Sequence, residues 1–340
     1  MGRGAEVTFR SAPTNQISFR VHQSGIQDRR NQGICGMARA AQANAMAGHL
    51  GAAVAAGYFI GEELPDLDEQ VYSFIEKELD RIMLGKEAIW FDPQKAGITI
   101  PELFKPFPDG PPQKEKIATI ATALAANIDK TRQAGHNVIF SSIAIRGLHD
   151  HPQFATDPII GGVRKLIAKF DGAVPGRGYY GKKRGWIQGS DIKLGADTDF
   201  PAYRNQQDMA EVVIDELIQS AAIRRQGHGG LFHVINHATA LTELSRLGYE
   251  KLAIRGLPAH HNHVRLWRSL PDVEEELGPL KSAKHDPRTL EYWQDGKSTQ
   301  WSAHLTHRVK TIFGFYTLLR FIESEEKRKQ AEEKFLYLMA

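Results

Sequence analysis

The sequence predicts an all-α protein: repeated helical hairpins arranged like an α/α toroid, with long irregular loops and a short extended N-terminal arm. The first reason is that apolar residues recur at helical spacing along most of the chain. The second reason is a short junction of a small residue and a histidine, which precedes an apolar helix at His49, His136, His228 and, more loosely, His304. Such self-similarity is typical of repeated helical architectures.

Composition and charge limit the class of protein. The 340 residues are 41% hydrophobic and 24% charged, as in ordinary globular domains, so the chain can bury a substantial core. The net charge of +3 is small, and acidic and basic residues are interspersed. We therefore expect no nucleic-acid partner.

Three absences in the sequence bear on location and redox chemistry. No apolar run is long enough to cross a bilayer, so we expect no membrane partner. The polar first residues lack the apolar core of a signal peptide, which favours a cytoplasmic protein. Cys35 is the only cysteine, so neither a disulfide framework nor a thiolate-rich metal site is expected.

Residues 1–33 are predicted to form the N-terminal arm. Apolar residues alternate with polar ones there, as in a short strand, and an ordered coil lying on the body is an equally good interpretation. The alternating residues are Val7, Phe9, Ile17, Phe19 and Val21. A single helical repeat domain is predicted to follow over 34–322.

The first two units of this domain follow one order. Small residues lead into an apolar helix at His49, and an amphipathic helix comes after it. A proline-rich loop over 85–113 then leads to the helix at His136, whose partner covers 159–170. The glycine-rich stretch 171–206 is long for a loop inside a compact domain, which favours a functional role.

The later units repeat this order more loosely. A helix over 207–225 leads into the apolar helix at His228, and the last apolar helix begins at His304. A loop at the rim is predicted to carry His260, His261 and His263. The charged segment 323–340 is predicted to be a separate helix with a solvated face, and a role as a subunit contact leaves a homo-oligomer open.

The repeated junction predicts where a site would form. If the apolar helices are inner helices that run the same way, their N-termini gather at one end of the domain. His49, His136, His228 and His304 would then converge on a central cavity. An open bundle or a solenoid, in which these ends do not meet, is the structural alternative.

His233 and His237 are the strongest candidates for catalysis. They are four residues apart, so they share one face of a helix, and imidazoles exchange protons near neutral pH. With His228 they are also a candidate site for zinc, iron or copper. No glutamate adjoins His233, so this is not the His-Glu-x-x-His pattern of zinc peptidases. Hydrogen-bonded core histidines are the structural alternative.

Further polar and aromatic residues are candidates for binding a small-molecule substrate. Tyr180 is predicted to take part in catalysis and, with Asn236, to donate hydrogen bonds to a developing oxyanion. The stretch 171–206 would act as a lid that brings aromatic and cationic groups to the substrate. The predicted substrate-binding residues are His49, His136, Asn236, Lys183, Arg184, Trp186 and Arg308.

Three histidine-bearing segments, 49–53, 232–237 and 304–310, resemble segments of the questin-oxidase-like family of α/α-toroid enzymes. That family is associated with oxygen-dependent opening of aromatic or quinone rings. The resemblance implies an oxidoreductase or oxygenase with a toroidal fold.

Three functions remain open at this point. The first is an oxidoreductase that acts on a small organic molecule in a histidine-lined cavity. The second is a lyase or hydrolase on a polar, sugar-like substrate, which is an analogy with other toroids. The third is a non-catalytic helical binding scaffold. Dependence on oxygen or on a redox cofactor would distinguish the first from the others.

Overall fold

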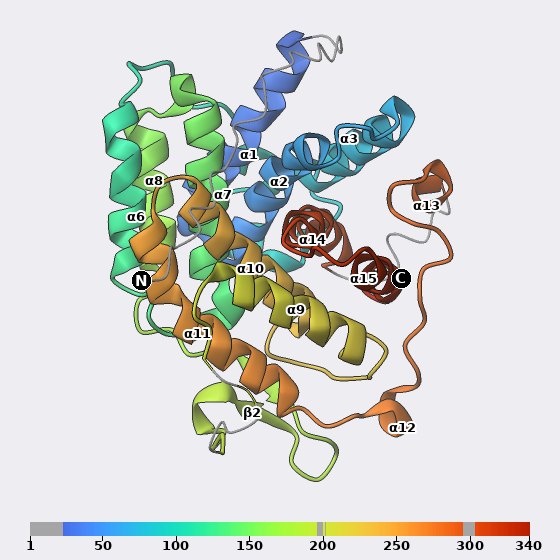
Figure 1. Cartoon of the computed structure of the whole chain (residues 1–340). Helices are drawn as coiled ribbons and strands as arrows, with labels where there is room; N and C mark the ends of the chain where they lie inside the picture. Colours follow the sequence, from blue (N-terminus) through green and yellow to red (C-terminus); the bar gives the residue numbers. More distant parts are fainter. Residues whose placement is uncertain (1–22, 196–199, 201, 295–302) are drawn as a thin grey trace, which may run out of the picture.

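The computed structural model describes residues 23–195, 200, 202–294 and 303–340, and it confirms the all-α class. Four helices, buried along most of their length, form the interior: α2 (Gly48–Glu63), α7 (His136–Asp150), α10 (Gly230–Arg246) and α14 (His304–Leu319). Each packs against two of the others, in the cyclic order α2, α7, α10, α14 (Figure 1). The α/α-toroid arrangement of the whole chain stays a prediction.

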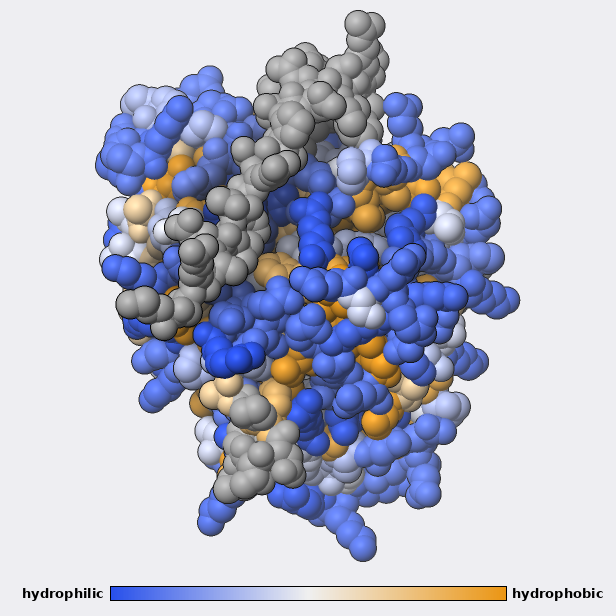
Figure 2. Space-filling model, viewed as in Figure 1, coloured by the Kyte–Doolittle hydropathy of each residue, from blue (hydrophilic) through white to orange (hydrophobic). Residues whose placement is uncertain are grey.

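Amphipathic helices cover this interior. The covering helices are α1 (Gln23–Ala43), α3 (Glu69–Met83), α6 (Ala118–Ala125), α8 (Asp157–Ala168), α9 (Gln206–Ser220), α11 (Glu250–Arg268) and α15 (Glu325–Phe335). In α3, apolar residues at helical spacing face α2 while the other face stays polar. Figure 2 shows the result on one face of the molecule: hydrophilic residues dominate, and hydrophobic ones form scattered patches.

Several boundaries differ from the sequence prediction. Helix α1 begins eleven residues before the expected domain start at 34, so 23–33 is helical, and the rest of the predicted arm lies outside the described residues. The loop 85–113 contains the short helices α4 (Pro93–Ala96) and α5 (Ile100–Leu103). Later short helices are α12 (Glu274–Leu277) and α13 (Leu290–Gln294).

The stretch 171–206 is also more ordered than expected. It contains an antiparallel hairpin of β1 (Arg177–Tyr179) and β2 (Trp186–Gln188), although no sheet was predicted there. An isolated bridge between Gly178 and Gly227 ties the hairpin to the start of α10. A side chain at Gly227 would meet the Gly178 backbone, so glycine permits this close approach.

The C-terminal helix α15 belongs to the body of the domain. The Lys327 amine pairs with Glu211 and, at 2.8 Å, with Asp215, both on α9. The Phe335 ring stacks on Phe315 of α14, with 4.0 Å between the ring centroids. The predicted C-terminal helix is therefore present with an exposed charged face, but its other face packs on the domain and it is not separate. No helix within the described ranges is long and apolar enough to cross a membrane.

Candidate functional site

The N-terminal turns of the four inner helices bring one histidine each to a common point. We call His49, His136, His233 and His307 the four-histidine cluster. His136 Nε2 lies 2.6 Å from His49 Nε2 and 2.9 Å from His233 Nε2. Ligand nitrogens of His49, His233 and His307 lie within 4.8 Å of one another. None of the four side chains is more than 8% exposed.

Left-handed residues at the helix starts aim three of these rings. The residues that precede α7, α10 and α14 are Gly135, Gly229 and Ala303, with φ of 85°, 81° and 70°. The chain thus turns sharply before each helix, and a backbone carbonyl faces the imidazole. His233 Nδ1 donates to Gly229 O, and His307 Nδ1 donates to Ala303 O at 2.8 Å. His136 Nδ1 donates in the same way to Gln133 O, whose residue has a φ of 43°.

These carbonyl contacts determine the tautomer of each ring. A carbonyl only accepts, so each Nδ1 carries the proton and each Nε2 of His136, His233 and His307 presents a lone pair. The 2.9 Å contact between His136 and His233 therefore places two lone pairs against each other. His307 Nε2 has no hydrogen-bond partner among the described residues. With these tautomers the Nε2 lone pairs of His233 and His307 meet no donor, and a cation among the nitrogens would satisfy them.

Protons do not supply that cation near neutral pH. Burial is the largest influence on all four rings, and it lowers their pKa values because a charged imidazole is poorly solvated there. The pKa of His136 falls to about 3. The rings are neutral, and the Nε2 atoms of His136, His233 and His307 each offer a lone pair. Neutral imidazole is the form of histidine that binds metal.

The nitrogen separations are also those of a metal site. Two nitrogens bound at about 2.05 Å lie about 2.9 Å apart at right angles and about 3.3 Å apart in a tetrahedron. The 2.9 Å separation between His136 and His233 matches the first geometry, whereas the 2.6 Å between His136 and His49 is shorter than either. Imidazole nitrogen suits zinc, copper, iron and nickel. The hydrogen bonds from Nδ1 to backbone carbonyls are the outer contacts that metal-bound histidines usually make.

His49 is held by a side chain instead of a carbonyl. Lys310 Nζ, on α14, lies 2.9 Å from His49 Nδ1. Lys310 is 2% exposed, and burial lowers its pKa to about 7, although the Glu87 carboxylate opposes this shift. Trp90 stacks on the other face of His49, with 3.9 Å between ring centroids. The fourth ring is thus fixed by contacts from two other segments of the chain.

Aromatic side chains enclose the cluster. Phe232 lies 4.8 Å from His307 between ring centroids, and Trp90 lies 5.5 Å from the same ring. Both are partly exposed, so they lie on the solvent side of the histidines. Phe140 and Phe170, which are fully buried, pack against His136 from inside. The site is therefore apolar around its nitrogen atoms.

A second group of histidines lies beyond this cluster. His237 Nδ1 is 3.4 Å from His263 Nδ1, and His263 Nε2 donates to His228 O at 2.8 Å. His260 Nε2 donates to Val234 O at 3.0 Å. His260 and His263 lie in α11, so the loop predicted around them is wrong. They are buried because α11 turns this face toward α10.

The expected set of His228, His233 and His237 is not brought together. Among the described residues, His49, His233 and His307 form the only metal-compatible group. His228 instead meets Tyr180, with 3.3 Å between Nε2 and the hydroxyl, at the base of the hairpin. His237 turns toward α11, although it lies one turn after His233 on α10.

The other predicted site residues lie away from the cluster. Tyr180 also bonds Ser269 Oγ at 2.6 Å, so its hydroxyl anchors the hairpin. Lys183, Arg184 and Trp186 are exposed on that hairpin. Arg308 is buried, pairs with Glu78 at 2.9 Å, and lies against the rings of α13. Arg308 Nη2 is thus engaged by a carboxylate, while Nε has no hydrogen-bond partner among the described residues. Asn236 lines a small cavity that Lys310 also lines.

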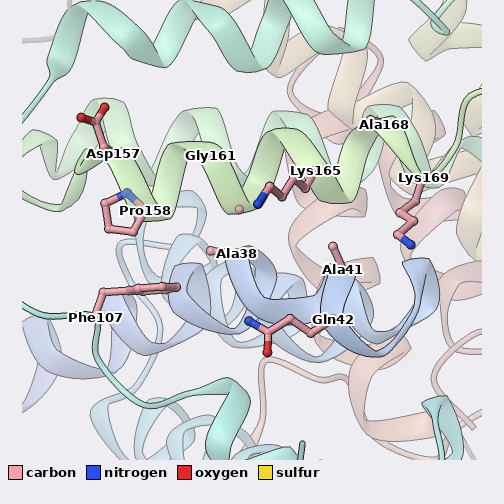
Figure 3. Close-up of a pocket in the computed structure, with 11 residues that line it drawn as sticks. Ala38, Ala41, Gln42, Phe107, Asp157, Pro158, Gly161, Lys165, Ala168 and Lys169 are labelled. Atoms are coloured by element: carbon pink, nitrogen blue, oxygen red, sulfur yellow. The ribbon is translucent and has the colours of Figure 1, made fainter. Parts of the chain in front are cut away.

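A surface groove of about 720 Å³ lies between α1 and α8. Figure 3 shows Lys165 of α8, and Lys169 directly after that helix, across from Gln42 on α1, with small residues between them. No histidine lines this groove, so its chemistry is unrelated to the cluster.

The sequence analysis assigned no role at this site to His307, Lys310, Trp90 or Glu87. A signal for the first was present: in 229–233 and 303–307 a small residue precedes a histidine by four positions. The more visible pairs, in which a small residue directly precedes His228 or His304, lie about one turn earlier, and the prediction of converging helix starts relied on them. Comparison of the chain with known protein families, with curated proteins and with solved structures found no match.

Proposed function

We propose that this chain is a metal-dependent oxidoreductase that acts on a small organic molecule, with the metal held by the four-histidine cluster. One observation carries the proposal: the lone pairs of His136 and His233 face each other at 2.9 Å in a buried, neutral site. Replacing that repulsion by bonds to a shared cation is the direct way to satisfy these groups. The segments that resemble questin-oxidase-like enzymes contain three of the four histidines.

The ligand set favours a redox metal over a hydrolytic one. Iron and copper accept ligands at right angles, whereas a structural or hydrolytic zinc ion is usually tetrahedral. When bound, such a metal would supply one-electron and oxygen chemistry. Trp90 and Phe232 would cover the site and exclude water, and Lys310 would orient His49 through Nδ1.

The lyase or hydrolase alternative remains distinguishable by metal identity and by oxygen dependence. A tightly bound zinc ion, with activity under anaerobic conditions, would support it. The scaffold alternative predicts no stoichiometric metal.

The first test is metal content, measured by elemental analysis on protein purified without chelators and on protein reloaded with iron, copper or zinc. We expect about one equivalent of metal in the wild type and loss of it in His136→Ala and His307→Ala. The matched control is His237→Ala, which removes a buried histidine from the second group and should leave the metal in place. Retention of metal in both cluster variants, or no binding by folded wild type, would overturn the proposal.

The second test is oxygen consumption by the loaded protein. Hydroxylated aromatic compounds and quinones are the first substrates to examine, because the resemblance implies them. Oxygen uptake should require the substrate and the metal together, and His307→Ala should abolish it. Turnover of a substrate by metal-loaded protein without oxygen would instead support the lyase or hydrolase alternative.

A further inference from the structure

We propose that a buried cavity between α7, α10 and α14 binds one water molecule between Lys310 and Asn236, and that Asn236 thereby positions Lys310 on the four-histidine cluster. This inference rests on the proposed function, because it assigns an outer residue to the metal site. The ligand class is a single small molecule that both donates and accepts hydrogen bonds.

The size of the cavity sets the size of the ligand. Its volume is about 10 Å³, which matches the space that about one water molecule requires. Apolar and polar side chains share its wall. They are Ile139, Ser142 and Ile143 from α7, Asn236, Thr239 and Ala240 from α10, and Lys310 and Phe313 from α14.

Asn236 brings an unmet acceptor to this cavity. Its side chain is 5% exposed, and Nδ2 donates to Thr311 Oγ1 at 3.3 Å. Its Oδ1 has no hydrogen-bond partner within the described part of the chain. A buried acceptor left without a hydrogen bond is destabilising. The neighbouring Thr239 hydroxyl does not serve it, since that hydroxyl donates to Gly314 O at 2.8 Å.

Lys310 brings the complementary group. Its Nζ contacts His49 Nδ1 at 2.9 Å and has capacity for further hydrogen bonds in either protonation state. A water molecule in the cavity would bond to Nζ and to Asn236 Oδ1 together. The flexible four-carbon stem of Lys310 would then be fixed at its tip, and with it the orientation of His49.

Gly314 keeps Asn236 in this position. A Cβ at residue 314 would lie 2.6 Å from Asn236 Oδ1 and 3.2 Å from Thr239 Oγ1. Helix α14 therefore approaches α10 closely only because residue 314 has no side chain. The Asn236 amide therefore lies against α14 at Gly314, which is one helical turn after Lys310.

The test combines cobalt titration with a crystal structure. Asn236→Leu removes the acceptor at similar volume, and we expect it to weaken cobalt binding by about 10- to 100-fold, as changes in outer contacts of metal sites do. The visible spectrum of the cobalt-saturated variant should also shift, because His49 changes orientation. Asn236→Ser keeps an acceptor and makes room for a second water, so it should restore most of the affinity and the spectrum. Ile143→Leu alters the apolar wall and should change neither.

A high-resolution crystal structure of the wild type tests the water site independently of metal. We expect density for one water within hydrogen-bond distance of Lys310 Nζ and the Asn236 amide. Absence of that water, or unchanged cobalt affinity and spectrum in Asn236→Leu, overturns this inference while the metal site stands. If folded wild type binds no metal at all, the proposed function fails, and the positioning role of Asn236 fails with it. The crystal structure then tests only whether the cavity binds a water molecule.

Discussion

The four inner helices carry a buried polar cluster at each end, and the two ends differ in how they are satisfied. At the C-terminal end, Arg146 of α7 lies 3.1 Å from Glu63 of α2 and 2.9 Å from Glu243 of α10. Arg320, which caps α14, reaches Glu63 at 2.8 Å, and Glu62 meets Arg146 at 2.6 Å. Opposite charges compensate one another there.

The N-terminal end has no such compensation among its histidines. Its three carbonyl-bound rings present lone pairs to a shared space, and their carbonyl contacts prevent them from turning away. Buried polar groups in this fold are therefore of two kinds: charges that compensate one another, and ring nitrogens whose lone pairs meet no donor. The arginine end is compensated within the chain and stabilises it, whereas the proposed metal would be needed to satisfy the histidine end.

The largest expected effect is at the arginine end. Arg146→Met removes the cation that Glu62, Glu63 and Glu243 share and leaves buried carboxylates uncompensated. We expect the free energy of unfolding, measured with denaturant, to fall by about 3–5 kcal/mol. Arg246→Met is the matched control: Arg246 also pairs with Glu243, but its side chain is 52% exposed, so its loss should cost about 1 kcal/mol or less. Equal losses in the two variants would contradict this account of the arginine end.

The same kind of substitution should act differently at the histidine end. In metal-free protein, His307→Leu replaces an unmet acceptor by an apolar side chain, and we expect it to keep or raise the free energy of unfolding. Metal at about 1,000 times its Kd should stabilise the wild type by about 4 kcal/mol, and this gain should vanish in the variant. Thermal unfolding with and without metal measures both quantities. A large loss of stability in metal-free His307→Leu would show that this end, too, is complete in itself.

The sequence was sufficient for the architecture of this site and insufficient for its members. Recurrence of a small residue before a histidine predicted that helix starts would converge, and His49 and His136 do meet. His233, the third member, was among the predicted catalytic residues, whereas the fourth was misassigned. His304 was predicted, but the left-handed turn before α14 places His307, about one turn later, on the inward face. His228 and His304 look equivalent in sequence to His49, but the backbone carries them past the cluster.

Lys310 and Glu87 show a second limit. Lys310 looks like an ordinary charged residue of a helix, and only the closing of α14 against α2 brings it to His49. Glu87 lies in a loop and is buried because its Oε2 accepts from Thr306 N at 3.1 Å. Contacts between segments this far apart in the chain produce no local sequence pattern from which they could be predicted.

Acid should distinguish the two ends through the histidines. Burial lowers the pKa of His260 to about 3, so between its ordinary value of 6.5 and that value the unfolded chain binds a proton that the folded chain does not. Stability is therefore lost as pH falls through this window, by about 1.4 kcal/mol per pH unit for each such histidine. Glu63 contributes in the opposite direction, because burial raises its pKa and stability falls as pH rises above 4.5 toward the raised value.

His260→Gln tests this window, since glutamine can still donate to Val234 O. Denaturant unfolding at pH 7 and pH 5 should show a smaller loss in the variant than in the wild type, by about 2 kcal/mol. Equal losses would mean that His260 titrates alike in the folded and unfolded chains.

The smallest effect concerns the turn that aims His307. Ala303 has a φ of 70°, a left-handed conformation that costs a residue with a side chain about 1 kcal/mol. Ala303→Gly should therefore raise the free energy of unfolding by up to about 1 kcal/mol and leave metal affinity unchanged, because the carbonyl keeps its direction. Ala303→Val should lower stability and weaken metal binding together, since a β-branched residue resists this φ and displaces the acceptor of His307 Nδ1. Paired denaturant and metal titrations measure both. If valine lowered stability with no change in metal affinity, the turn at residue 303 would stabilise the start of α14 without orienting the His307 ring. The difference between the two ends would then depend only on where the histidine rings lie.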